Sequence, residues 1–150
     1  MNNTQFDAEL TIPLNELSSF SLAYLGDAFF ELWCRQKILQ RLKNRRLVHL
    51  HVVQWVRCQT QSRLAQLIQP LLHIEEEKIY RQGRNSKTTS PPKHATIKDY
   101  RAATGFECLV GYWYLEKQTK RFEELMNLSE IVEYLESVMP VRKNSFTNAA

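Results

Sequence analysis

Hydrophobic residues recur every three or four positions along most of this chain, which is the spacing of amphipathic helices. The strongest pattern covers residues 17–42, where two adjoining faces are apolar, and it predicts one long helix at the centre of the domain. Ser18 or Ser19 is suited to cap its first turn. A second helix is predicted over residues 45–68, with Asn44 as its cap.

The rest of the chain is predicted to form shorter helices and one loop. The ranges of these helices are about 75–82, 97–117, 119–127 and 130–138. Thr96 and Asp99 resemble a capping pair, with Asp in place of the usual Glu, in front of the longest of them. Residues 83–93 are rich in Gly, Pro, Ser and Thr and contain no acid, so we predict a surface loop there.

The composition is that of one globular domain. Of the 150 residues, 43% are hydrophobic and 24% are charged, and only four are Gly and five are Pro. We therefore predict a single all-α domain over residues 1–150, with a core at about 17–138 and a frayed tail at 141–150. Three cysteines without a Cys-x-x-Cys pair argue against a disulfide framework or a zinc site. No run of eighteen apolar residues occurs, so we expect a soluble, cytoplasmic protein without a membrane span.

Charge is distributed unevenly along the sequence. Residues 1–31 carry five acids and no base, whereas residues 32–74 carry eight bases and no acid. A basic block of this size repels itself unless a polyanion or neighbouring acidic helices offset it. Nucleic acid is one candidate partner, and a solvated helix face neutralised by acidic helices is an equal alternative.

Two carboxylates occupy positions that packing alone does not require. Asp27 lies inside the first long helix, and Glu107 lies in the middle of a second strongly apolar helix, where an ionised carboxylate is costly to bury without a partner. If Gly26, Gly105 and Gly111 let these two helices cross closely, the carboxylates would converge on one hard cation. Mg²⁺ suits such a site because it binds one or two carboxylates and keeps several waters. Pairing of each acid with Arg or Lys from another helix is the alternative.

Other candidate residues have simpler explanations. Glu31 is expected to form a salt bridge with Arg35 rather than to join a metal site. His49 and His51 point to different sides of a helix and have no third ligand nearby, so we do not expect them to bind a metal. The three tryptophans are expected in the core or in a dimer contact. No Gly-rich phosphate loop and no Gly-x-Ser-x-Gly elbow occurs, which argues against nucleotide hydrolysis and acyl transfer.

Three sequence blocks that follow one another in order point to a known family. Residues 22–31 read Leu-Ala-Tyr-Leu-Gly-Asp-Ala-Phe-Phe-Glu, and further blocks lie at residues 81–87 with 92–95 and at residues 100–115. Over about residues 17–128 the chain resembles ribonuclease III, in the form carried by the compact Mini-ribonuclease III family. The resemblance implies an all-helical endonuclease domain, a homodimer with two active sites, Mg²⁺ as cofactor and double-stranded RNA as substrate. In that family the RNA is the precursor of 23S ribosomal RNA.

The resemblance also implies roles for individual residues. Asp27 matches the signature aspartate and Glu107 matches the glutamate of the second acidic motif, so both are expected to be catalytic and to hold the metal. Full-length ribonucleases III carry two further carboxylates where this chain has Ala23 and Thr104. The mini family shares this loss, so more waters are expected around the ion. As a hypothesis, one such water attacks a phosphodiester in line while the metal offsets the charge on the phosphate.

Without a separate RNA-binding domain, which mini enzymes lack, the catalytic domain itself must hold the duplex. A-form RNA is recognised by its shape, its phosphates and its 2′-hydroxyls. The loop residues expected to bind RNA are Arg84, Asn85, Lys87 and Lys93. A loop that is only a solvated connector is the alternative.

Two functions from other classes stay open at this stage. A non-catalytic dimeric RNA-binding or ribosome-assembly module on the same fold is favoured by the two missing carboxylates. A helical protein-interaction domain would leave Asp27, Glu107 and the acid-free loop unexplained. Whether a ribosomal protein presents the RNA to the enzyme is also left open. Metal-dependent cleavage of duplex RNA would distinguish these functions.

Overall fold

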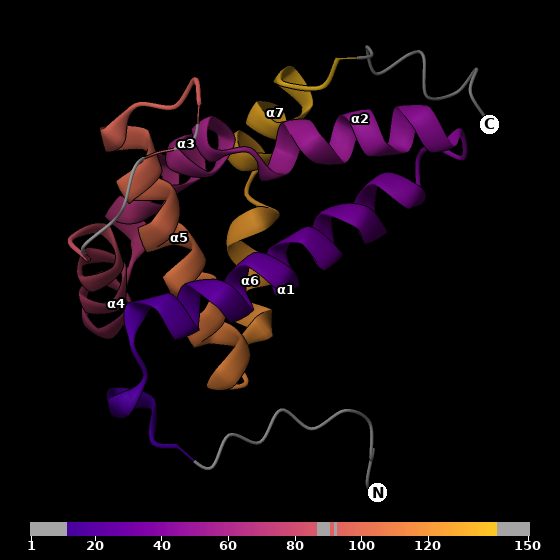
Figure 1. Ribbon diagram of the computed structural model, residues 1–150. Helices are drawn as coiled ribbons and strands as arrows, with labels where there is room; N and C mark the ends of the chain where they lie inside the picture. The colour runs from indigo at the N-terminus through magenta and orange to yellow at the C-terminus, as the bar shows by residue number, and fades with distance from the viewer. Residues whose placement is uncertain (1–11, 87–90, 92, 141–150) are drawn as a thin grey trace, which may run out of the picture.

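The structure is a computed structural model that describes residues 12–86, 91 and 93–140 (Figure 1). Its elements in chain order are η1 (Leu14–Glu16), α1 (Ser19–Leu39), α2 (Arg45–Val56), α3 (Cys58–Ile68), η2 (Gln69–Leu71), α4 (Ile74–Arg84), α5 (Ile97–Leu115), α6 (Thr119–Met126) and α7 (Ser129–Ser137). No strand occurs in this part of the chain, so the all-α prediction is confirmed. None of the helices found there has the length and hydropathy to cross a bilayer. The predicted frayed tail at 141–150 lies outside the described residues.

Three helices begin at the caps that the sequence predicts. Ser18, Asn44 and Thr96 each accept a hydrogen bond from the backbone N–H three residues later, at 3.1, 3.1 and 3.0 Å, and so begin α1, α2 and α5. Only one of the two hydrogen bonds of the predicted capping pair forms, because the Asp99 carboxylate does not accept from the backbone N–H of Thr96. It accepts a hydrogen bond from Ser62 Oγ of α3 at 2.8 Å instead.

The second predicted helix is in fact two helices. Arg57 has extended backbone angles (φ −68°, ψ 158°), which separate α2 from α3. Side chains of α3 satisfy carbonyl groups at the end of α2: Thr60 Oγ1 donates to the Gln54 carbonyl at 2.6 Å, and Gln61 Nε2 donates to the Val56 carbonyl at 2.8 Å. The prediction was wrong here because apolar residues continue across the break, and hydrophobic spacing does not show this polar stabilisation.

The centre of the molecule is α5 rather than α1. Ten of its 19 residues are buried, and α1, α3 and α4 pack around it (Figure 1). The prediction of a central first helix was wrong, because α1 leaves four large apolar side chains exposed: Phe20, Tyr24, Leu32 and Leu39. An apolar pattern on several faces does not show which face the other helices will cover. The three tryptophans are buried in the core, as predicted.

Two glycines bring α1 and α5 into backbone contact. A Cβ atom on Gly26 would lie 1.8 Å from the carbonyl oxygen of Glu107, and a Cβ on Gly111 would lie 2.1 Å from a carbonyl oxygen of α1. Neither position can hold a side chain without separating the helices. A Cβ atom on Gly105 would lie 2.8 Å from Tyr80 of α4. Gly105 therefore makes room for Tyr80, and its assignment to the crossing of α1 and α5 was wrong. The close crossing predicted from Gly26 and Gly111 is therefore confirmed.

A buried carboxylate joins α4, α5 and α6. Glu76 is 2% exposed and accepts hydrogen bonds from Trp113 Nε1 at 2.8 Å, from Arg121 Nε and Nη2 at 2.9 Å, and from the His73 backbone N–H at 2.7 Å. Burial alone would raise the pKa of Glu76, but these hydrogen bonds and the Arg121 charge outweigh it and lower the pKa to about 2.

Candidate active site

A hollow of about 680 Å³ lies where the N-terminal half of α1 meets α5. Its lining residues are Ser18, Ser19, Phe20, Ala23, Tyr24, Asp27, Ser86, Tyr100, Thr104 and Glu107. Both predicted acids are among them. Most of the remaining polar groups are hydroxyls, so the hollow combines two carboxylates with weakly polar hydrogen-bonding partners.

The two acids reach this hollow from different helices. Asp27 comes from α1 and Glu107 from α5, and they meet because Gly26 allows the α1 backbone to rest on the Glu107 carbonyl. Glu107 is partly buried, whereas Asp27 is exposed. The expectation that both acids are buried was therefore wrong for Asp27. Its apolar neighbours in sequence belong to other faces of α1, so Asp27 itself faces solvent.

The surroundings of Glu107 strongly raise the pKa of its carboxyl group. Burial, the hydrogen bond with Asp27 and the charge of Asp27 together raise the pKa of Glu107 to about 8, although a hydrogen bond from Gln61 acts in the opposite direction. The two carboxyl groups thus lie close enough to influence each other strongly. At neutral pH such a pair requires either a shared proton or a cation.

The sequence left open that each acid is paired with Arg or Lys. Within residues 12–86, 91 and 93–140, neither Asp27 nor Glu107 forms an ion pair. Glu31 does form the expected salt bridge with Arg35 along α1. The negative charge of the hollow is therefore not offset by any described side chain.

The residues of the hollow fit a hydrated divalent cation. The described part of the chain contains no group of three or more His, Cys, Asp or Glu side chains arranged to hold a metal. Mg²⁺ does not need such a group, because it binds through one or two carboxylates and retains several waters. Thr104 Oγ1 donates to the Tyr100 carbonyl at 3.0 Å and keeps lone pairs that can accept from water. Ala23, which also lines the hollow, leaves space for such waters.

The two histidines are separated as predicted. His49 is exposed, whereas His51 is buried with its Nδ1 atom 2.7 Å from the Leu47 carbonyl oxygen. They lie on different sides of α2, as the spacing predicts.

Two of the four residues expected to bind RNA lie at the end of α4. Arg84 ends that helix, and Asn85 follows it with its Oδ1 atom 3.4 Å from Arg84 Nε. The next residue, Ser86, lines the hollow itself. Lys93 is exposed shortly before α5, and Lys87 lies outside the described residues. The end of α4 therefore adjoins the two acids.

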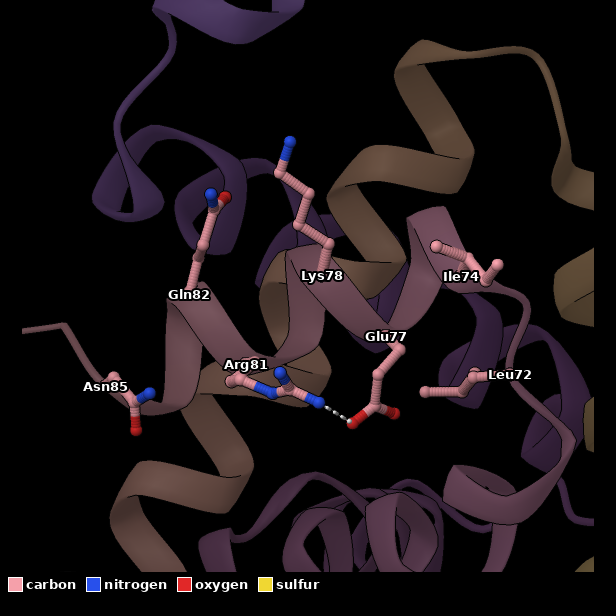
Figure 2. A pocket seen from close by; sticks show the side chains of 7 residues that line it. All are labelled: Leu72, Ile74, Glu77, Lys78, Arg81, Gln82 and Asn85. Carbon is pink, nitrogen blue, oxygen red and sulfur yellow. Dashed lines mark hydrogen bonds and ion pairs between the residues drawn. The ribbon is translucent and has the colours of Figure 1, made fainter.

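A second hollow, of about 610 Å³, lies along the outer face of α4. Its lining residues are Leu72, Ile74, Glu77, Lys78, Arg81, Gln82 and Asn85 (Figure 2). Figure 2 shows Lys78 and Gln82 pointing to the same side of the helix, while Arg81 is hydrogen-bonded to Glu77 at 3.1 Å. The single carboxylate of this hollow is already paired, so it is a poorer cation site than the hollow of Asp27 and Glu107.

The basic block at residues 32–74 is partly neutralised. Arg35 pairs with Glu31, and Arg41 pairs with Glu136 of α7 at 3.1 Å. The first pair lies within α1, whereas the second shows that a neighbouring helix offsets part of this charge, as one of the two explanations requires.

One further residue near the acids, Gln61, is not predicted from the sequence. Gln61 is buried on α3 and forms a hydrogen bond that lowers the pKa of Glu107. No sequence signal marks it, because α3 is far from both acidic motifs along the chain and only the packing of α3 on α5 brings Gln61 close.

Comparison with known proteins identifies the family of this chain. The ribonuclease III domain family matches residues 21–118, a range that includes both acids. A Mini-ribonuclease 3 from Clostridium tetani is 40% identical over 117 residues, which cover 77% of this chain and 78% of the relative. The enzyme of the same name from Symbiobacterium thermophilum is 39% identical, with 78% and 90% covered. A crystal structure of a Fusobacterium nucleatum protein superposes with a TM-score of 0.71 at 31% identity, covering 76% of this chain and 88% of that one. The chain therefore belongs to the ribonuclease III family, in its compact Mini-ribonuclease 3 branch, and is an RNA endonuclease.

Proposed function

We propose that this endonuclease cleaves double-stranded RNA in a reaction that depends on Mg²⁺ held by Asp27 and Glu107. One observation carries the proposal: two carboxylates from different helices converge in one hollow, and no described cationic side chain pairs with either. The resemblance to Mini-ribonuclease III supports the precursor of 23S ribosomal RNA as the substrate.

The two acids have different positions and so different tasks. Asp27 is exposed and meets both solvent and substrate, whereas Glu107 is partly buried and forms the rear of the site. A Mg²⁺ ion bound between them would lower the pKa of its bound water and offset negative charge on the phosphate. The chain itself contributes the carboxylates, the neighbouring hydroxyls and the space left by Ala23.

Duplex RNA is the substrate class that suits the surroundings of the site. Arg84 and Asn85 directly precede Ser86, which lines the hollow, and Lys93 is an exposed cation shortly before α5. Such cations and hydrogen-bond donors bind phosphates and 2′-hydroxyls. The aromatic rings of the three tryptophans are buried in the core and offer no surface on which single-stranded bases would stack.

An exposed aromatic pair in the lining of the hollow supports a homodimer. Phe20 and Tyr24 are 73% and 70% exposed, and their rings stack with centroids 5.5 Å apart. Exposed aromatic pairs of this kind are typical of protein contacts. A second copy related by two-fold symmetry would cover them and place a second site for the other RNA strand.

Cleavage of a purified duplex RNA, with Mg²⁺ and then with chelator, tests the function. We expect Asp27→Asn and Glu107→Gln each to abolish cleavage while RNA affinity and folding are largely retained. Glu31→Gln is the matched control, because this acid also lies on α1 but is paired with Arg35, and its activity should stay close to that of the unaltered protein. Normal cleavage by either site variant would overturn the assignment.

The same assay tests the alternative function, a non-catalytic RNA-binding module. This alternative is favoured by the lack of carboxylates at Ala23 and Thr104. A non-catalytic module would bind the duplex without cutting it at any Mg²⁺ concentration. Family membership favours the enzyme. A cytoplasmic location and the presentation of substrate by a ribosomal protein stay predictions.

A further inference from the structure

Gln61 is an uncharged polar side chain in an otherwise closely packed part of the molecule. It is 2% exposed and lies on the part of α3 that packs against α5. Its neighbour Ser62 donates to Asp99 of α5, which holds the two helices together at this point. The Gln61 amide therefore has a defined place behind the Glu107 side of the active site.

The hydrogen bonding of this amide is only partly explained by the fold. Its Nε2 group donates to the Val56 carbonyl at 2.8 Å, where α2 ends. Its Oε1 atom is buried without a hydrogen-bond partner among the residues that the structure describes. A buried acceptor without a donor is destabilising, and such atoms are rare in folded proteins.

A hydrogen bond to a carbonyl group at the end of α2 does not by itself require a glutamine. Thr60 performs the same task for the Gln54 carbonyl with a hydroxyl, and so leaves no buried side-chain atom without a hydrogen bond. A second role for Gln61 would explain why its second polar atom is tolerated.

We propose that Gln61 is a positioning residue for metal binding: its amide nitrogen donates to the Glu107 carboxyl and orients that carboxyl toward Asp27. The inference rests on the proposed Mg²⁺ site of Asp27 and Glu107. The amide nitrogen has two hydrogens, so it can serve the Val56 carbonyl and the Glu107 carboxyl together. The hydrogen bond from Gln61, which lowers the pKa of Glu107, agrees with this arrangement.

An amide suits this position better than a cationic side chain. Arg or Lys behind Glu107 would orient the carboxylate but would also neutralise it, and so would compete with the metal ion. An amide orients the carboxylate through a neutral hydrogen bond and leaves its charge available to the metal. Residues that orient metal ligands in this way typically change metal affinity or activity 10- to 100-fold when they are replaced.

The test compares Gln61→Met with Thr60→Val. Both variants remove one side-chain hydrogen bond to the end of α2, but only Gln61 faces Glu107. Binding of Mn²⁺ to the RNA-free protein is measured by electron paramagnetic resonance, and the Mg²⁺ concentration for half-maximal cleavage is measured in parallel. We expect Gln61→Met to weaken Mn²⁺ binding and to raise the Mg²⁺ requirement about 10- to 100-fold. We expect Thr60→Val to leave both quantities within about twofold.

A second variant keeps the inference testable if Gln61→Met does not fold. Gln61→Asn keeps the amide but shortens it by one carbon, so it should withdraw from Glu107, and excess Mg²⁺ should restore cleavage. Unchanged Mn²⁺ binding in the folded Gln61 variants, or equal changes in Thr60→Val, would show that Gln61 is only structural. That outcome leaves the proposed function intact as long as Asp27→Asn and Glu107→Gln are inactive.

Discussion

The buried Glu76–Arg121 pair leads to a quantitative prediction about acid stability. The folded protein holds Glu76 at a pKa of about 2, against an ordinary value of 4.5. At about 1.4 kcal/mol per pKa unit, this difference contributes about 3 kcal/mol to the free energy of unfolding at neutral pH. Because the folded pKa is depressed, the contribution is complete above about pH 5.5 and is lost as the pH falls through 4.5 toward 2. At pH 3 about 1 kcal/mol should remain.

Glu76→Gln tests this prediction because Gln has nearly the same shape but cannot carry the negative charge. Urea denaturation should show a loss of about 3 kcal/mol at pH 7 relative to the unaltered protein, and a loss of only about 1 kcal/mol at pH 3. Glu77→Gln is the control, since Glu77 forms a more exposed ion pair with Arg81 along the same helix and should cost less than about 1 kcal/mol. A loss from Glu76→Gln that is the same at both pH values would refute the reasoning.

Two further predictions concern the helix crossing and the dimer. Gly26→Ala places a Cβ 1.8 Å from the Glu107 carbonyl oxygen, so α1 must move away from α5; we expect a loss of at least about 1–3 kcal/mol in urea denaturation together with reduced cleavage, and unchanged values would contradict the close crossing. Replacement of Phe20 and Tyr24 by Ser should give a folded monomer in sedimentation velocity, and a persistent dimer would show that another surface forms the contact.

Local features of the fold were predictable because they depend on neighbours in the chain. The caps at Ser18, Asn44 and Thr96 use side chains that reach the backbone three residues later, so their spacing is visible in the sequence. The break at Arg57 was not predictable from hydrophobic spacing. It depends on hydrogen bonds from Thr60 and Gln61 to carbonyl groups that become available only when α2 ends.

The candidate site was predictable in part. Asp27 and Glu107 are ionisable residues among apolar neighbours in the sequence, which marks them as candidates. Glycines such as Gly26 indicate a close approach of helices. The sequence does not show that Asp27 is exposed, because exposure depends on which faces of α1 other helices cover. It also does not show that Gln61 lies behind Glu107, because that requires α3 to pack on α5.

The sequence by itself determined the helical class, the helix caps, the two acidic positions and the likeness to Mini-ribonuclease III, because each depends on residue types and on their spacing along the chain. Only the tertiary structure decided that α5 is central, that Glu76 is buried against Arg121, and that the two acids share one hollow without a described cationic partner. These properties come from contacts between segments far apart in sequence. The burial and charge of a side chain's surroundings are set by those contacts.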